Sequence, residues 1–391
     1  MSESLNAFAE NKLAALQQRN LLRTLAETER IGPIEVLRGE KRLISFSCND
    51  YLNLSQHPDI KAAAIAATEK FGAGSGASRL VTGNHPLFAE LEDKLAALKG
   101  TEAACVFGSG YLANTGIIPA LIGKDDLICV DELSHACIFA GGSLTAGALH
   151  VFRHNDAQHL GEILKAHRSV HPRAMIVTDG VFSMDGALAP IEALADLAEE
   201  FDARLMTDDA HGIGVVGGGR GSSHAHGNEG RVPLQMGTLS KAIGAYGGYL
   251  CASQPVIDLI KTRCRTLIYS TGLPPGTVAA AIAALDLIRN DPGYAALPLK
   301  KAKAFTKLLG LADAESPIVP IVLGDTERTL AASKMLEDEG YLVIAIRPPT
   351  VPDGTARLRV TFTAQHDDED VARLADLIRS KILIHDPVEA A

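Results

Sequence analysis

An acid, a histidine and a lysine that could act together stand where apolar runs of this sequence end. The segment TDDAHG places Asp208 three residues before His211, and GTLSK ends at Lys241. An Asp and a His at this spacing suit a metal pair, a salt-bridged structural pair or two groups that orient one ligand. Because no second His, Cys or Glu cluster at ligand spacing accompanies them, we expect no metal site.

Lys241 makes the pattern more specific, because it follows the next apolar run after Asp208. A lysine amine that is desolvated or close to other cations is partly neutral, and a neutral amine can form a Schiff base. Pyridoxal 5'-phosphate requires such a lysine, an acid that keeps its ring nitrogen protonated, and hydroxyl and backbone donors for its phosphate. Asp208 suits the acid, since a contacting opposite charge shifts a pKa by about 1 to 3 units. A solvated lysine without a role is the alternative.

Donors for a phosphate occur in GSGYLANTG, residues 108–116, where glycines follow an apolar run and precede a helical pattern. The unpaired N–H groups and the dipole of a helix N-terminus favour an anion. Thr238 and Ser240 could add hydroxyl groups. The ring of His135 could lie flat on a cofactor, although a hydrogen-bonded core histidine explains this residue equally well.

Alternating strands and helices would have to position these groups, which predicts an α/β fold. The apolar runs are continuous rather than alternating, and helical stretches such as IEALADLAEEF separate most of them, as in a mostly parallel sheet buried on both faces. The expected strands are residues 103–107, 126–131, 148–152, 174–180, 203–211, 234–240 and 247–253. Ligands bind outside the carboxyl ends of such strands, so the polar clusters should meet there.

The ends of the chain predict two smaller parts. Residues 5–30 have the spacing of an amphipathic helix, and two short β-type runs flank the turn RGEK. Beyond about residue 290, alternating apolar runs close to helices predict an α+β domain with an antiparallel sheet. We therefore expect an N-terminal arm at residues 1–50, a large α/β domain at 51–288 and a small domain at 289–391.

Composition excludes several functions. The 391 residues carry a formal net charge of −10, which disfavours nucleic acid as a partner. Six widely spaced cysteines are typical of buried thiols in a reducing compartment. No apolar run approaches the roughly 20 residues that cross a membrane, and the N-terminus lacks the apolar core of a signal peptide. We expect a cytoplasmic protein.

Two other glycine-rich segments suggest different chemistry and fail on context. GAGSGASR, residues 72–79, resembles a dinucleotide-binding loop, but a helical pattern precedes it where a strand is required. GVVGGGRGSSHAHG, residues 214–227, is not a P-loop, because no lysine and Ser or Thr follow its glycines at the required spacing. A nucleotide-dependent dehydrogenase and a catalytically dead binding protein remain the alternatives of a different class.

Eight segments in order resemble the motifs of the α-oxoamine synthases, a family of fold-type I pyridoxal-phosphate enzymes, over about residues 20–380. They are SCNDYLNLSQHP, GAGSGASRLVTGNHPLFAELEDKLA, FGSGYLAN, DELSHA, TDGVFSMDG, TDDAHGIG, TLSKAIGAYGG and RPPTVPDGTARLRVTFTA. The resemblance implies a large domain with a mostly parallel seven-stranded sheet, an N-terminal arm and a small C-terminal α+β domain. It also implies a homodimer with shared active sites.

The resemblance further implies a role for each residue that matches a motif. Lys241 would bind the cofactor and act as the base, Asp208 would pair with the pyridine nitrogen, and His211 would bind the ring hydroxyl oxygen. His135 would stack on the ring. The other cofactor contacts would be Gly110, Tyr111, Ser183, Thr238 and Ser240, with Ser270 and Thr271 reaching the neighbouring subunit's phosphate. Tyr111 stands where the family often has phenylalanine, which leaves its backbone contact intact.

For the substrates, the resemblance implies that Arg359 holds the amino-acid carboxylate as a bidentate fork. Arg23, Asn49, His135 and Thr350 would contact the amino acid or the acyl thioester. The motifs SRLVTG and RPPTVPDGTARLR point to a decarboxylating condensation of L-alanine with a pimeloyl thioester, carried by coenzyme A or acyl carrier protein, in biotin biosynthesis. Glycine C-acetyltransferase, 5-aminolevulinate synthase and long-chain acyl serine condensation share the cofactor motifs and are the sibling alternatives.

Overall fold

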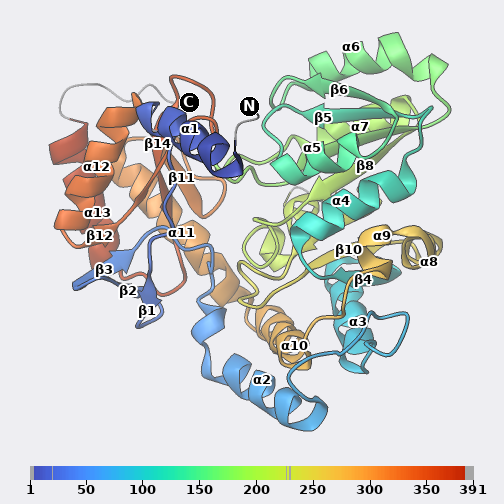
Figure 1. Cartoon of the computed structure of the whole chain (residues 1–391), viewed down its shortest axis with the longest axis horizontal. Coiled ribbons are helices and arrows are strands. Elements are labelled where there is room, and N and C mark those ends of the chain that lie inside the picture. Colours follow the sequence, from blue (N-terminus) through green and yellow to red (C-terminus); the bar gives the residue numbers. More distant parts are fainter. Residues whose placement is uncertain (1–3, 20, 226, 229, 384–391) are drawn as a thin grey trace. The chain divides into compact units, whose positions relative to one another are not determined.

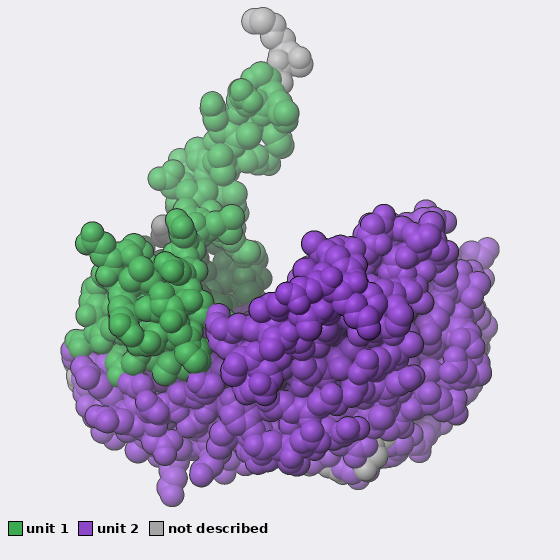
Figure 2. Space-filling model, turned by 90° about the horizontal axis from the view of Figure 1, so that it is seen from below, with its two compact units in different colours: residues 1–45, 321–359 green, residues 46–320, 360–391 purple. Residues whose placement is uncertain are grey.

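The computed structural model describes residues 4–19, 21–225, 227–228 and 230–383. These residues belong to two compact units, coloured separately in Figure 2. Unit 1 comprises residues 1–45 and 321–359, and unit 2 comprises residues 46–320 and 360–391. The three-part division expected at residues 50 and 288 stays a prediction.

A seven-stranded sheet forms the centre of unit 2 (Figure 1). Its strands are β4 (Ala103–Phe107), β5 (Leu127–Asp131), β6 (Ala148–Phe152), β7 (Ala174–Asp179), β8 (Ala203–Asp208), β9 (Leu234–Thr238) and β10 (Gly248–Ala252). They lie in the order β4-β10-β9-β8-β7-β5-β6, and within this sheet β10 runs antiparallel to both of its neighbours. The mostly parallel sheet of the sequence prediction is confirmed, with strand bounds within three residues of those expected.

Helices cover both faces of this sheet, and the apolar side chains of β4 show why, because they alternate between two cores. Cys105 and Phe107 of β4 face one core, and Ala104 and Val106 face the other. The first core receives α4 (Gly110–Leu121), α5 (Ala136–Ser143), α8 (Gln254–Arg263) and α9 (Arg265–Ile268). On the opposite face lie α3 (Leu87–Lys99), α6 (Ala157–His167) and α7 (Ile191–Glu200). The helices α2 (Pro58–Phe71) and α10 (Pro275–Asn290) pack on each other and add side chains to the core that contains α3. Short 3-10 turns occupy Leu54–Gln56, Arg168–Val170, Gly217–Gly219 and Ser222–His224.

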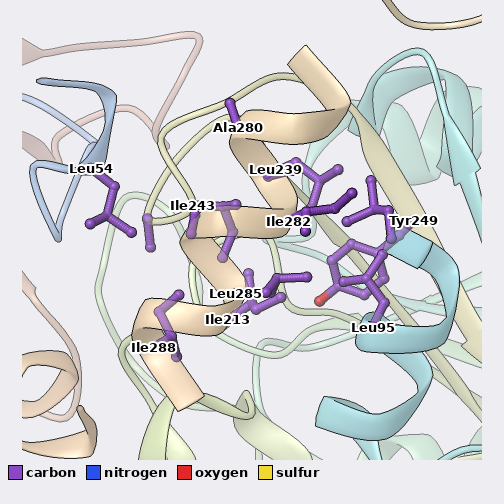
Figure 3. Close-up of a cluster of buried hydrophobic side chains, with 14 of the residues drawn as sticks. Leu54, Leu95, Ile213, Leu239, Ile243, Tyr249, Ala280, Ile282, Leu285 and Ile288 are labelled. Atoms are coloured by element: carbon purple, nitrogen blue, oxygen red, sulfur yellow. The ribbon is translucent and has the colours of Figure 1, made fainter. Parts of the chain in front are cut away.

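The core on the α10 side fixes the loop that carries Lys241. Figure 3 shows Leu285 and Ile282 of α10 close to Leu95 and Tyr249, which come from α3 and β10. Ile243, two residues after Lys241, is fully buried in the same cluster. Burying an aliphatic side chain of this size contributes about 1.5 to 3 kcal/mol. The backbone beside Lys241 is therefore anchored by apolar packing.

Unit 1 contains a four-stranded sheet and corrects one sequence prediction. The strands β1 (Glu29–Arg30), β2 (Glu35–Arg38), β3 (Lys41–Ser45) and β12 (Tyr341–Leu342) form this sheet, with α1 (Leu5–Gln18) and α12 (Thr326–Asp338) in the same unit. The helix expected over residues 5–30 ends at Gln18, and Asn20 lies outside the described residues. The segment that follows is not helical although its apolar spacing suits a helix, and a tertiary contact accounts for this difference. Arg347 donates to the carbonyl oxygen of Leu22 in this segment.

A three-stranded sheet includes strands that run through the boundaries between the units. Its order is β11 (Ile318–Gly324), β14 (Ala356–Thr361) and β13 (Ile344–Ile346), and β13 pairs antiparallel with β14, as the alternating pattern predicted. The neighbouring helices α11 (Pro292–Leu309) and α13 (Asp368–Leu377), with a π-turn at Ile378–Ile382, lie in unit 2. Among the described residues, no helix combines the length and apolarity needed to cross a membrane.

Candidate active site

A cavity of about 220 Å³ in unit 2 collects side chains from the carboxyl ends of the parallel strands. Strands β4, β7, β8 and β9 end beside it because they run in the same direction. Its lining includes Gly110, Tyr111, His135, Ser183, Asp208, His211, Thr238, Ser240 and Lys241, together with Ser109, Cys137, Asp179, Val181 and Ala210. The structure thus brings nine sequence-predicted residues to one place, and their individual roles stay predictions.

Lys241 begins a chain of hydrogen bonds that ends at Asn49. Its Nζ lies 2.7 Å from Nε2 of His211, whose Nδ1 lies 2.7 Å from the hydroxyl of Tyr51. Tyr51 donates to Oδ1 of Asn49 at 3.3 Å. The bonds run in one direction when Lys241 donates to Nε2, because the ring proton then sits on Nδ1 and is donated to Tyr51. The chain fixes both the tautomer and the orientation of His211.

Asp208 presents a carboxylate that is held on both oxygens. Its Oδ1 accepts the backbone N–H of Ala210 at 2.8 Å, and its Oδ2 accepts from Nδ2 of Asn114 at 2.7 Å. Asp179 is its partner in the register of the neighbouring strand, so two buried carboxyl groups lie side by side. Burial and the neighbouring Asp208 charge raise the pKa of Asp179 well above its usual value. Like charges in a low-dielectric site favour one ionised carboxylate, and Asp208 accepts two hydrogen bonds where Asp179 accepts one, from the N–H of His135.

His135 is fixed at the start of α5 by the residue two positions later. The backbone N–H of Cys137 donates to Nδ1 of His135 at 3.2 Å, and the Cys137 thiol lies 2.8 Å from the same nitrogen. Burial lowers the pKa of His135 below its ordinary value, and nearby Lys241 lowers it further. Since Nδ1 accepts, the neutral ring carries its proton on Nε2. A neutral, oriented imidazole is suited to lie against an aromatic ring.

The start of α4, which lines the same cavity, has the donors of an anion site. Ser109 caps α4 by accepting the N–H of Leu112, and the amides of Gly110 and Tyr111 belong to the first helical turn, which the helix itself leaves unpaired. Thr238 and Ser240 add hydroxyls that lie 2.8 Å apart. A Cβ on Gly110 would come within 3.3 Å of the Cβ of Thr238, a tight contact that glycine avoids.

This donor set fits pyridoxal 5'-phosphate. The cavity offers a phosphate end at α4, a carboxylate at Asp208, a flat neutral ring at His135 and an amine at Lys241. These are the chemical groups that the phosphate, ring nitrogen, ring face and aldehyde of this cofactor require. The residues that the structure describes therefore satisfy each requirement set out from the sequence.

Six predicted residues are absent from the described lining of this cavity, and one of them, Asn49, is joined to it through Tyr51 and His211. Ser270 and Thr271 line a different, smaller pocket of unit 2 and are absent from the described lining of the Lys241 cavity. In unit 1, Nη2 of Arg23 donates to Oγ1 of Thr350 at 3.1 Å, so these two predicted substrate residues contact each other. Arg359 is buried in β14, opposite Ile344 of β13. The roles of all six stay predictions.

A buried ion pair supports the site from behind. Lys99, at the end of α3, lies 2.7 Å from Oδ2 of Asp209, and both side chains are fully buried. Lys99 also donates to the carbonyl oxygen of Arg220, and Oδ1 of Asp209 accepts the N–H of Ser222. Because Asp209 adjoins Asp208, this pair holds the glycine-rich loop and the end of β8 together.

Sequence reasoning missed Tyr51, Asn114 and Cys137, although it quoted Tyr51 and Asn114 within motifs. Asn114 stands four residues after Gly110 and hence on the same face of α4, a signal that was available. Tyr51 lies 160 positions before His211 and offers no local signal. Contacts at that separation depend on the tertiary fold.

Comparisons with known proteins agree with the geometry. Residues 41–378 match the aminotransferase class I and II family. The 8-amino-7-oxononanoate synthase of Methylocella silvestris is 64% identical over 88% of this chain and 99% of its own length, and that of Granulibacter bethesdensis is 62% identical over 96% and 98%. A serine palmitoyltransferase structure from S. paucimobilis, solved with a bound PLP–myriocin aldimine, superimposes with a TM-score of 0.87 at 29% identity, covering 95% of this chain and 96% of that one.

Proposed function

This chain belongs to the aminotransferase class I and II family, and on that basis we propose that it condenses L-alanine with a pimeloyl thioester. The products are 8-amino-7-oxononanoate, CO2 and the free acyl carrier, in biotin biosynthesis. The observation that carries the proposal is the meeting of Lys241, His211 and Asp208 in one cavity. The names of near full-length relatives favour alanine and pimeloyl thioester over the sibling reactions.

Pyridoxal phosphate, when bound, supplies an electron sink for the carbanion at the alanine Cα. Asp208 would accept the hydrogen bond of the protonated ring nitrogen. Asn114 and the N–H of Ala210 donate to its carboxylate and keep it in place. Of the residues that line the cavity, His135 would cover the ring face, and Gly110, Tyr111, Thr238 and Ser240 would bind the phosphate. These residues orient the reacting carbon and the base before any proton moves.

Lys241 moves the proton in this reaction. Its amine would take the proton from the alanine Cα, and His211, 2.7 Å from Nζ, would orient the amine. The new carbon–carbon bond forms as the thioester carbon–sulfur bond breaks, and the carboxylate derived from alanine leaves as CO2. Arg359 binds that carboxylate before it leaves, and Arg23, Asn49 and Thr350 contact the substrates.

Two measurements test the proposal. Purified protein should show an absorption band near the visible edge that borohydride removes, and Lys241→Ala should lack both the band and turnover. Lys124→Ala, which changes an exposed lysine, should keep them. The second measurement offers alanine, glycine or serine with pimeloyl, acetyl, succinyl or palmitoyl thioesters, each on coenzyme A and on acyl carrier protein. Turnover only with glycine would reject the assignment, and the carrier preference would identify the acyl donor.

We also propose a homodimer in which Ser270 and Thr271 bind the phosphate in the partner's site, because they line a separate pocket in their own chain. Lys241→Ala and the double variant Ser270→Ala/Thr271→Ala should each be inactive. Random mixing of the two should restore about a quarter of wild-type activity, because half of the dimers then contain one complete site. No recovery on mixing would place both residues in the site of their own chain.

The cytoplasm is the compartment we propose. All six cysteines are free thiols, and five of them are buried. Proteins that persist with free thiols are typical of reducing compartments. Detection of the tagged chain in a periplasmic fraction would contradict this location.

A further inference from the structure

The side-chain amide of Asn114 joins two parts of the site that come from different elements. Asn114 lies in α4 and is fully buried. Its Nδ2 donates to Oδ2 of Asp208 at 2.7 Å and to the thiol sulfur of Cys137 at 3.1 Å. The two hydrogens of this NH2 group thus make one hydrogen bond to the end of β8 and one to the start of α5.

The charge of Asp208 determines which way this amide points. An ionised carboxylate only accepts hydrogen bonds, so the amide must present nitrogen to it. As a result, Oδ1 of Asn114 is buried and has no hydrogen-bond partner among the described residues. A buried acceptor without a donor is unfavourable, and the charge-assisted bond to Asp208 has to outweigh it. This arrangement favours a dedicated donor over a packing role.

The amide also distinguishes Asp208 from its neighbouring carboxyl group. Asp179 and Asp208 are register partners at the ends of β7 and β8. Asp208 accepts from Asn114 and Ala210, whereas Asp179 accepts the N–H of His135 at 3.2 Å. Both carboxyl groups line the cavity, and the two shorter hydrogen bonds stabilise negative charge on Asp208.

The second arm of Asn114 reaches His135 through Cys137. The Cys137 sulfur accepts from Asn114 and lies 2.8 Å from Nδ1 of His135. Burial, helped by the Asp208 charge, raises the pKa of this thiol to about 12, so it remains protonated and donates its S–H to the imidazole. Asn114 therefore helps to fix the ring that covers the cofactor face as well as the acid at its edge.

Close packing holds the backbone at Asn114. A Cβ on Gly141 of α5 would come within 2.6 Å of the carbonyl oxygen of Asn114, and a Cβ on Gly116 would come within 2.5 Å of the Cys264 sulfur. Both glycines let neighbouring helices approach α4 at backbone distance. This close approach helps to place the Asn114 amide between Asp208 and Cys137.

We propose that Asn114 is a positioning residue that holds Asp208 and His135 in register around the edge and face of the pyridoxal-phosphate ring. This inference rests on the proposed function. Asn114 would keep the ring nitrogen protonated indirectly, by holding the Asp208 carboxylate in place. Loss of the amide should therefore lower cofactor affinity and leave the Schiff-base lysine able to react.

Asn114→Leu tests this assignment, because leucine has a similar size and no donor. Thr115→Val is the matched control, since Thr115 is a buried residue of the same helix whose hydroxyl donates to the carbonyl oxygen of Tyr111. Both proteins are reconstituted with pyridoxal phosphate that carries 15N in its ring. The measurements are the dissociation constant of the cofactor and the 15N chemical shift of the ring nitrogen.

We expect Asn114→Leu to form the borohydride-sensitive band, to bind the cofactor about 10- to 100-fold more weakly and to shift the ring-nitrogen signal toward the unprotonated form. Thr115→Val should match the wild type in cofactor dissociation constant and in the 15N chemical shift. Wild-type affinity and chemical shift in Asn114→Leu would overturn the proposal. Failure of the wild type itself to form the band would instead reject the proposed function.

Asn114→Asp provides a second test if the leucine variant does not fold. A protonated aspartic acid can still donate to Asp208, whereas an ionised one repels it. Cofactor affinity of this variant should therefore fall steeply as pH rises, relative to the wild type. A pH profile parallel to that of the wild type would overturn the proposal.

Discussion

Two charged clusters of this protein have the same ion-pair distance and opposite surroundings. In unit 2, Nζ of Lys99 lies 2.7 Å from Asp209, with both side chains at 0% exposure. In unit 1, Nζ of Lys41 lies 2.7 Å from Asp338, with side-chain exposures of 44% and 57%. Distance alone would rank the pairs equally. Burial makes the two pairs differ in energetic importance. Water screens the exposed pair, whereas each buried charge has only its partner and nearby polar groups to stabilise it.

The clusters also differ in what they hold. Lys99 and Asp209 connect α3 to the backbone of Arg220 and Ser222, directly beside Asp208. Lys41 and Lys334 share Glu337 and Asp338 at the surface, so each acid keeps a cation when one lysine is lost. We expect sensitivity to mutation to be concentrated in the first cluster.

The largest effect is expected for Lys99→Met, which leaves Asp209 buried without its cation. Removing one member of a buried pair typically costs about 3 to 5 kcal/mol of unfolding free energy. The midpoint of urea unfolding measures this loss. The double variant Lys99→Met/Asp209→Leu should recover most of it, since no buried charge remains. A single variant with the wild-type midpoint would contradict the comparison.

An intermediate and pH-dependent effect is expected for Asp179→Asn. Because burial and the Asp208 charge raise the pKa of Asp179, the folded state keeps a proton that the unfolded chain loses above its ordinary pKa of about 3.9. Wild-type stability therefore falls as pH rises above this value, by up to roughly 1.4 kcal/mol per pH unit. The neutral asparagine removes this dependence, so unfolding midpoints from pH 4 to 7 should increasingly favour the variant.

Asp126→Asn is the control of opposite sign. Burial alone would raise the pKa of Asp126, but hydrogen bonds from Arg173 and from the N–H of Gly123 lower it. A lowered carboxyl pKa contributes stability above the unfolded pKa that is lost as pH falls. Asp126→Asn should therefore be less stable than the wild type near neutral pH and should approach it in acid. Equal pH slopes for the two variants would contradict the assignment of Asp179.

The smallest effect is expected for Lys41→Ala in the exposed cluster. Lys334 and Lys41 together lower the pKa of Asp338 to about 2, and Lys334 still lies 2.7 Å from it after the substitution. Exposed pairs contribute little because water competes for both charges. The unfolding midpoint should stay within experimental error of the wild type at low salt and at high salt. A loss comparable to that of Lys99→Met would remove the distinction between the two clusters.

Much of the large sheet and of the cavity was predictable because both depend on local pattern. Continuous apolar runs such as AACVF and AMIVTD indicated strands buried on both faces, and β4 and β7 occupy them. Parallel strands bring their carboxyl ends to one edge, so Asp208, Thr238 and Lys241 had to meet. The early end of α1 was not predictable, because contacts with residues more than 300 positions away hold Leu22 and Arg23.

By itself, the sequence determined which chemical groups stand at the strand ends, including the amine, the acid and the imidazole of Lys241, Asp208 and His211. Only the tertiary structure decided how those groups are held. Asn114 reaches Asp208 across 94 positions, and Lys99 reaches Asp209 across 110. The physical reason is that strand periodicity is local, whereas hydrogen bonds between buried side chains depend on which helix packs on which face of the sheet.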